Sequence, residues 1–144
     1  MRYCVNTNSE INLKRKLHLL LLFVMLLSAC AAQSSALQGT WKLIQYGSSD
    51  SMTPAVDDAD AALTFADDGT VTGSGGCNSL GGEYEVKGNE ITFGPITSTL
   101  MGCEEPRMTQ ESFVTQVLTG TAQYEIEGDT LTITNNDNVL VFSK

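Results

Sequence analysis

Two kinds of hydrophobic pattern divide the chain. Residues 17–27 form a mostly apolar run that directly follows the basic cluster at residues 14–16. From Leu37 onward, short runs rich in β-branched and aromatic residues alternate with polar positions and are broken by glycine-containing turns. An apolar run of about 11 residues is typical of a signal-peptide core and is too short to span a bilayer. The later pattern predicts antiparallel strands.

The first predicted strand covers residues 38–46, with Trp41 on one face and Tyr46 on the other. The polar stretch over residues 47–60 is predicted to be a loop. Hairpin-linked strands are predicted along most of the remaining chain, because alternating runs are separated by Asp-Gly, Gly-Asn and Gly-Asp turns. The total is about seven to eight strands.

One segment, residues 105–119, has a helical pattern instead. Phe113, Val114, Val117 and Leu118 fall on one stripe of such a helix. A single amphipathic helix among hairpin-linked strands predicts an α+β, mainly β fold, in which the helix packs against a strongly curved antiparallel sheet.

A cysteine follows the small pair Ser28–Ala29 at the end of the apolar run. This LSAC sequence resembles the bacterial lipobox. The resemblance implies that residues 1–29 are a signal peptide and that the new N-terminal residue, Cys30, carries lipid on its thiol. Residues 30–36 then form a lipidated tether, and one domain covers residues 37–144. The alternative, a plain secretory signal with an incidental cysteine, stays open at this stage.

Charge and composition exclude several classes of function for the exported part of the chain. The whole chain has a formal charge of −9, and residues 1–29 contain four basic side chains and one acidic side chain, so removing them leaves −12. The remaining Lys and Arg side chains do not cluster, which argues against nucleic-acid binding. The single histidine, His18, is lost with the signal. We therefore predict no catalytic residue, no metal site and no cofactor, and we expect that the protein is not an enzyme.

Two cysteines are left in the exported domain, Cys77 and Cys103. In an oxidising compartment such a pair is most economically a disulfide. A redox or metal site is the alternative, but it needs a Cys-x-x-Cys spacing or further His and Cys ligands, and the exported domain has neither.

A combination of motifs extends from the first strand to the end of the chain. It comprises Gly-Thr-Trp at residues 39–41, a glycine-rich GxxGCN element, a T-x-M-x-C element, a Glu-x-aromatic pair in the helix and a final Y-x-I-x-G-D-x-L-x-I strand pair. The central positions are Gly76, Cys77, Asn78, Thr99, Met101, Cys103, Glu111 and Phe113. Together they resemble the META domain, the family of HslJ-like lipoproteins. Leu100 stands where Met or Thr is common, a mild departure.

The resemblance implies a half-open antiparallel β-barrel with a helix filling one side. It also implies a part in stress response, without established catalytic residues. We therefore expect a non-enzymatic lipoprotein of the cell envelope, anchored in the membrane through Cys30 and located at the outer membrane facing the periplasm. Its partner is expected to be an envelope protein or a lipid. The alternative hypothesis is an inhibitor of a basic hydrolase such as lysozyme or a protease, with the acidic segment 47–60 entering the active site.

Overall fold

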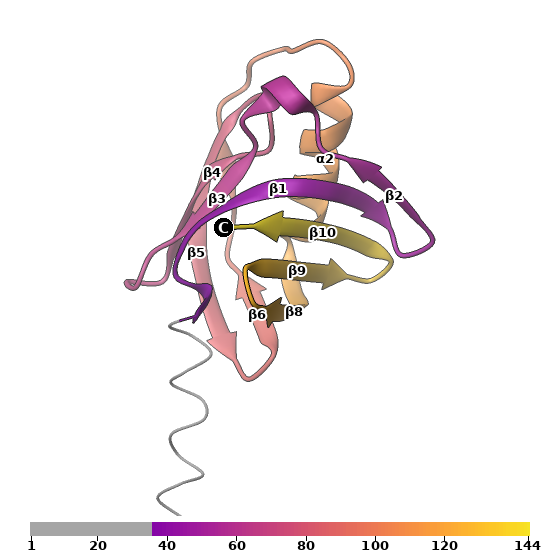
Figure 1. Ribbon diagram of the computed structural model, residues 1–144. Coiled ribbons are helices and arrows are strands. Elements are labelled where there is room, and N and C mark those ends of the chain that lie inside the picture. Colours follow the sequence, from indigo (N-terminus) through magenta and orange to yellow (C-terminus); the bar gives the residue numbers. More distant parts are fainter. Residues whose placement is uncertain (1–35) are drawn as a thin grey trace, which may run out of the picture. The chain divides into compact units, whose positions relative to one another are not determined.

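The structure, a computed structural model, describes residues 36–144 (Figure 1). The predicted signal peptide, the lipidation at Cys30 and all but the last residue of the predicted tether lie outside the described residues. No helix within residues 36–144 is long and apolar enough to cross a membrane.

The described residues form an antiparallel β-sheet, one α-helix and one short 3-10 helix. The strands are β1 (Gly39–Ser48), β2 (Ser51–Pro54), β3 (Ala62–Phe65), β4 (Thr70–Ser74), β5 (Ser79–Lys87), β6 (Glu90–Phe93), β7 (Thr97–Ser98), β8 (Gly120–Glu127), β9 (Thr130–Asn135) and β10 (Asn138–Ser143). The 3-10 helix is η1 (Asp57–Ala59), and the α-helix is α2 (Arg107–Val117).

Eight of the strands close into a barrel. They follow one another in the order β1, β3, β4, β5, β6, β8, β9 and β10, and antiparallel pairing between β10 and β1 completes the ring. Strand β2 pairs with the second half of β1, and β7 pairs with β5. The predicted mainly β fold with one helix is confirmed. The barrel is fully closed, whereas the family resemblance implied a half-open one, because β1 is long enough to pair with β3, β2 and β10. Closure leaves few sheet edges exposed.

Strand β1 contains a bulge that changes which side chains face the interior. Its register with β10 shifts between Leu43 and Gln45. Leu43 and Tyr46 are both buried, whereas Ile44 is 40% exposed. The prediction that Tyr46 lies on the face opposite Trp41 is therefore wrong, because a bulge adds one residue and shifts the alternation of the strand.

The segment predicted as a polar loop is mostly regular structure. Strand β1 continues to Ser48, the two-residue turn Ser49–Asp50 reverses the chain, and β2 runs back along β1. The 3-10 helix η1 follows. The hydrophobic pattern gave no sign of β2 because this short strand covers no core and its side chains are mostly exposed.

Helix α2 packs against β1, β9 and β10, and it runs behind β1 and β10 in Figure 1. Val114, Val117 and Leu118 from the predicted stripe are buried. Large apolar side chains occupy the interior of the barrel. Those that are fully buried include Leu37, Trp41, Leu63, Phe65, Ile91, Leu118, Leu131, Ile133, Leu140 and Phe142.

Candidate functional site

The glycine-rich turn between β4 and β5 lies directly against α2. A Cβ atom on Gly75 would lie 3.0 Å from Cα of Glu111, and a Cβ on Gly76 would lie 2.7 Å from Nε2 of Gln110. Gly76 also has a φ of +124°, which side-chain-bearing residues rarely adopt. The glycines are therefore needed for the close approach of this turn to the helix.

The carboxylate of Glu111 joins the helix to this turn. Its Oε2 accepts hydrogen bonds from the backbone N–H groups of Cys77, at 3.0 Å, and of Asn78. Its Oε1 accepts a bond of 2.6 Å from the Asn78 side-chain amide. Three N–H groups thus converge on one nearly buried carboxylate, and such charge-assisted bonds are stronger than neutral ones.

Asn78 extends the network to the segment that leads into the helix. Its Oδ1 accepts bonds from the Thr99 hydroxyl, at 2.8 Å, and from the Met101 backbone N–H, at 2.7 Å. Its Nδ2 also donates to the Met101 carbonyl oxygen at 3.2 Å. One buried side chain therefore holds the hydroxyl of Thr99 and the backbone of Met101, on the two sides of Leu100.

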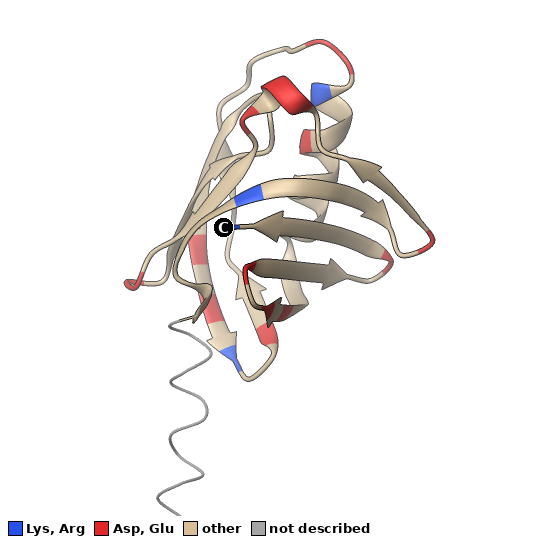
Figure 2. Cartoon of the chain, viewed as in Figure 1, with Lys and Arg blue, Asp and Glu red and all other residues tan. Residues whose placement is uncertain are grey.

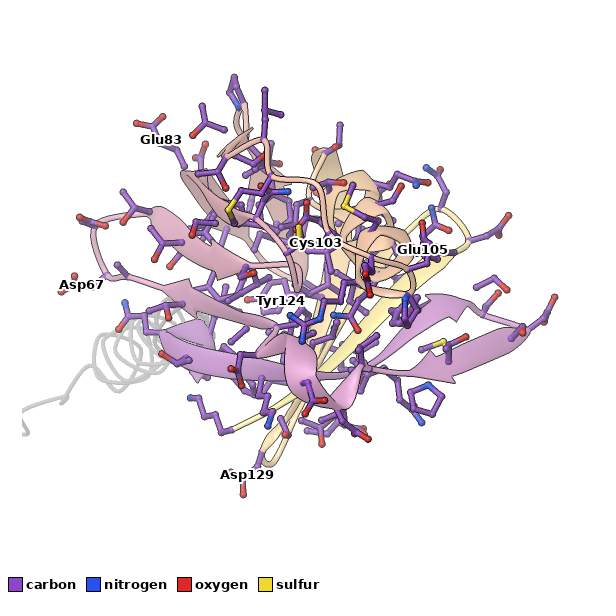
Figure 3. The ribbon with its side chains drawn as sticks, turned by 90° about the horizontal axis from the view of Figure 1, so that it is seen from above. Asp67, Glu83, Cys103, Glu105, Tyr124 and Asp129 are labelled. Atoms are coloured by element: carbon purple, nitrogen blue, oxygen red, sulfur yellow. A yellow bond between two sulfur atoms is a disulfide. The ribbon has the colours of Figure 1, made fainter. Side chains whose placement is uncertain are left out.

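Cys77 and Cys103 form a disulfide with a Cα–Cα distance of 5.9 Å. This bond ties the glycine-rich turn to the segment before α2 a second time, next to the Asn78 contacts. Figure 3 views the barrel from above and labels Cys103 and Glu105 in the segment that leads into α2. The structure thus brings the predicted cysteine pair together within the hydrogen-bonded cluster.

Phe113 is the one central motif residue that lies apart from this cluster. Its ring is half-buried and packs at a tilted angle on Tyr46, with 5.4 Å between ring centroids. The other central motif residues meet at one end of the barrel. They are Gly76, Cys77, Asn78, Thr99, Met101, Cys103 and Glu111, and we call them the motif cluster.

Gln110 also belongs with this cluster, although the sequence did not single it out. The side chain is fully buried, accepts a bond from the Val56 N–H at 2.7 Å and donates to the Gly75 carbonyl at 2.8 Å. A polar residue gives no signal in a hydrophobic pattern. The available sign was its spacing of four from Val114, which places it on the buried stripe of the helix.

The hydrogen-bonding capacity of the motif cluster is used within the protein. Among the described residues, no buried side-chain nitrogen or oxygen lacks a hydrogen-bond partner. In the same part of the chain, no group of three or more His, Cys, Asp or Glu side chains is placed to hold a metal ion. A cluster of this kind holds the backbone in place rather than presenting a reactive group.

A shallow, open depression lies elsewhere, between the β3–β4 turn and strands β5 and β6, and two aromatic residues, Tyr84 and Phe93, line it. The Tyr84 hydroxyl donates to the Ala66 carbonyl at 2.7 Å. Burial, followed by the negative charges of Asp68 and Asp67, raises the pKa of Tyr84. The phenol therefore stays protonated at neutral pH, which is unsuitable for a base or nucleophile.

The most exposed large apolar side chains in the described part of the chain are Met101 of the motif cluster and its neighbour Leu100. Leu100 is 97% exposed and Met101 is 55% exposed. Residues 99–103 thus combine a tightly held backbone with apolar side chains in solvent, and we call this segment the tip. Sequence reasoning gave Leu100 no role, because exposure cannot be read from a leucine in a non-periodic segment.

Several solved structures share this fold at low sequence identity. A protein from Burkholderia xenovorans, solved by NMR, has a TM-score of 0.65 and 22% identity, covering 78% of this chain and 86% of that chain. A DUF4847 family protein from Bacteroides vulgatus has a TM-score of 0.54 and 18% identity, covering 74% and 92%. A lipocalin-like protein from Bacteroides uniformis has a TM-score of 0.50 and 20% identity, covering 75% and 97%. These likenesses show the fold alone.

No match is found among curated proteins. The model of the META domain family, in contrast, matches residues 34–144, which include the whole barrel, its helix and the motif cluster. The chain therefore belongs to the META domain family.

Proposed function

We propose that this protein is a non-enzymatic lipoprotein of the cell envelope that acts by binding a protein partner in stress response or envelope integrity. The observation that carries this proposal is the motif cluster. The polar side chains that would be the first candidates for catalysis, Asn78 and Glu111, are engaged with backbone N–H and C=O groups. A function that depends on the surface is then the simplest use of the domain.

The filled interior of the barrel favours binding of a partner on the outer surface over binding of a lipid inside the barrel. Eight-stranded barrels are just wide enough either to be filled by side chains or to hold one small ligand. Here the fully buried side chains include Trp41, Phe65 and Phe142. A bound acyl chain would have to displace them.

Membrane attachment is tested at Cys30. In cells grown with labelled palmitate, Cys30→Ala should abolish labelling and leave uncleaved precursor, because the lipid-dependent signal peptidase requires the modified cysteine. Cys4→Ala is the matched control, since Cys4 precedes the predicted cleavage point and should leave labelling unchanged. Persistent labelling of Cys30→Ala would disprove the anchor.

The membrane itself is tested by fractionation. Ala31 and Ala32 follow the cysteine, and in bacteria with two membranes Asp directly after the cysteine retains a lipoprotein in the inner membrane. We therefore expect the protein in the outer-membrane fraction and the Ala31→Asp variant in the inner-membrane fraction. Wild-type protein in the inner membrane would contradict this location.

The second candidate function, inhibition of a basic hydrolase, is favoured by the acidic surface of the domain, which carries Asp and Glu side chains at both ends of the barrel (Figure 2). Asp57 and Asp58 on η1 and Glu104 before α2 lie at the end that also carries the tip (Figure 2). The direct test is a lysozyme activity assay with the fragment of residues 34–144. Full lysozyme activity in the presence of micromolar fragment would remove this candidate for lysozyme.

A further inference from the structure

We infer that the tip, residues 99–103, is a preformed docking element with Leu100 as its anchor. The fitting partner is a protein with an apolar pocket that is bordered by basic side chains. The inference rests on the proposed binding function and names its site and the chemistry of its partner. It combines three observations: exposure, a fixed backbone and local charge.

Exposure and order occur together at Leu100. The leucine side chain is almost entirely in solvent, yet the backbone on its two sides is fixed. Thr99 bonds through its N–H to the Ser79 carbonyl, at 3.0 Å, and through its hydroxyl to Asn78. Met101 is held by Asn78 through both its N–H and its carbonyl oxygen.

A fixed backbone lowers the entropic cost of binding, because the segment needs no ordering when it enters a pocket. The disulfide at Cys103 adds a covalent restraint two residues after Met101. A single solvent-exposed leucine would not by itself indicate a binding site, because such leucines are common on protein surfaces. Here, an almost fully exposed leucine is followed directly by a partly exposed methionine in a doubly restrained segment, which fits an apolar anchor for a partner's pocket.

Acidic side chains near the tip indicate which type of partner it can bind. Asp57, Asp58, Glu104 and Glu105 lie on η1 and on the segment between the tip and α2, with Arg107 as the basic residue among them (Figure 2). The Arg107 guanidinium donates to the Asp58 carbonyl oxygen, which holds η1 beside the start of α2. An apolar tip beside carboxylates is complementary to an apolar pocket with a basic border.

The same charge disfavours a bilayer as the occupant. Anionic lipid attracts basic segments and repels acidic ones. In Figure 1 the segment between β7 and α2 arches over the upper end of the barrel, whereas β1 begins at its lower end. The tip therefore projects away from the point where the chain enters the domain, so a tethered domain can present it to another protein.

The experiment uses the full-length chain in the cells that produce it. A photo-crosslinking amino acid replaces Leu100 in one variant and Thr72 in a control, because Thr72 is an exposed outward residue of β4. We expect one discrete protein adduct from position 100 and none of that mass from position 72. Crosslinks from position 100 to lipid alone, no discrete protein adduct, or the same adduct from both positions would overturn the inference.

Charge dependence then tests the stated chemistry of the partner. Asp58→Lys with Glu104→Lys, in the chain carrying the crosslinker at position 100, should lower the adduct yield about tenfold, since charged clefts and patches change association rates by this order. Glu125→Lys with Glu127→Lys on β8 is the matched control with the same change in net charge and should leave the yield unchanged. Glu105 is left intact because its carboxylate accepts bonds from the N–H and hydroxyl of Thr109 at the start of α2.

Equal losses in both double variants would also overturn the inference, because they would indicate a general charge effect. Thermal unfolding of the 34–144 fragments should show that both double variants are folded. Palmitate labelling separates this inference from the proposed function. If the protein is labelled and found in the outer membrane but gives no position-specific adduct, docking through the tip is disproved and the lipoprotein proposal stands. If the wild-type chain is not labelled, the lipoprotein proposal is disproved.

Discussion

Replacement of Glu111 by alanine should strongly destabilise the domain. The substitution removes the acceptor of three N–H groups, the backbone amides of Cys77 and Asn78 and the Asn78 side-chain amide. Gly75 and Gly76 allow the turn to lie so close to the helix that these donors have little room to find other partners. The carboxylate therefore contributes more to stability than its place on a helix surface suggests.

The magnitude follows from the donors left behind. A buried donor without an acceptor costs about 1–3 kcal/mol, and the Cys77 amide is only partly buried. The three donors together give an expected loss of about 3–6 kcal/mol in the free energy of unfolding, a large part of the stability of a typical domain, which is about 5–15 kcal/mol.

Glu111→Gln should cost less than alanine, but it is not a neutral change. The glutamine oxygen can serve the two backbone amides, and its NH₂ group then faces the Asn78 NH₂. Rotating the Asn78 amide removes that conflict but turns its NH₂ toward the Met101 N–H. One donor stays unsatisfied in either arrangement, so we expect a loss of about 1–3 kcal/mol.

Urea unfolding of the 34–144 fragment measures both losses through the fluorescence of Trp41, the single tryptophan, which is fully buried. Glu125→Ala, an exposed residue of β8, is the control and should change stability by no more than about 0.5 kcal/mol. Stability of Glu111→Ala within about 1 kcal/mol of wild type, below the cost of a single unsatisfied donor, would refute the reasoning about the carboxylate.

Three further changes test neighbouring parts of the structure. Replacing Cys77 and Cys103 by serine should lower stability by roughly 3–4 kcal/mol, because the bond closes a loop with a sequence separation of 26; thermal unfolding with and without reductant checks this. Gly76→Ala should destabilise by about 1–3 kcal/mol, from its positive φ and the overlap with Gln110; equal melting temperatures would contradict it. The side-chain and backbone hydrogen bonds from Thr70 lower the pKa of Asp68 in the folded protein. The ionised carboxylate therefore stabilises the fold fully above the pKa that Asp68 has in the unfolded chain, and this contribution is lost as the pH falls through its lower pKa in the folded protein. Thr70→Val should raise this pKa, which NMR titration of the carboxyl group measures.

The fold was predictable where side chains alternate between core and solvent. In β9 and β10 the apolar residues at every second position are buried, as the pattern indicates. The pattern failed where the backbone departs from regular alternation. The bulge near Ile44 turns Tyr46 inward, and no residue type in that stretch marks the extra position.

Closure of the barrel could not be derived from the pattern of single strands. It depends on the pairing of β1 with β10, whose residues lie near opposite ends of the domain sequence. Strand β2 was missed for a different reason. Its stability comes from backbone pairing with β1, and its side chains bury too little surface to leave a hydrophobic signal.

The motif residues that mark the family also lie in and around the segment that we propose binds a partner, although Leu100, the anchor of the proposed contact, is not one of them. Asn78, Thr99 and Glu111 accept hydrogen bonds from backbone N–H groups, and none of their buried polar atoms lacks a hydrogen-bond partner. The residue between two fixed positions, Leu100, points into solvent and bears none of these bonds. Its side chain can therefore change without loss of the network. The hydrogen-bonded motif residues thus hold one backbone shape, while the side chain at position 100 can vary to fit a partner. Motif matching therefore finds the residues that hold the backbone, and only the structure points to Leu100 as the residue that binds.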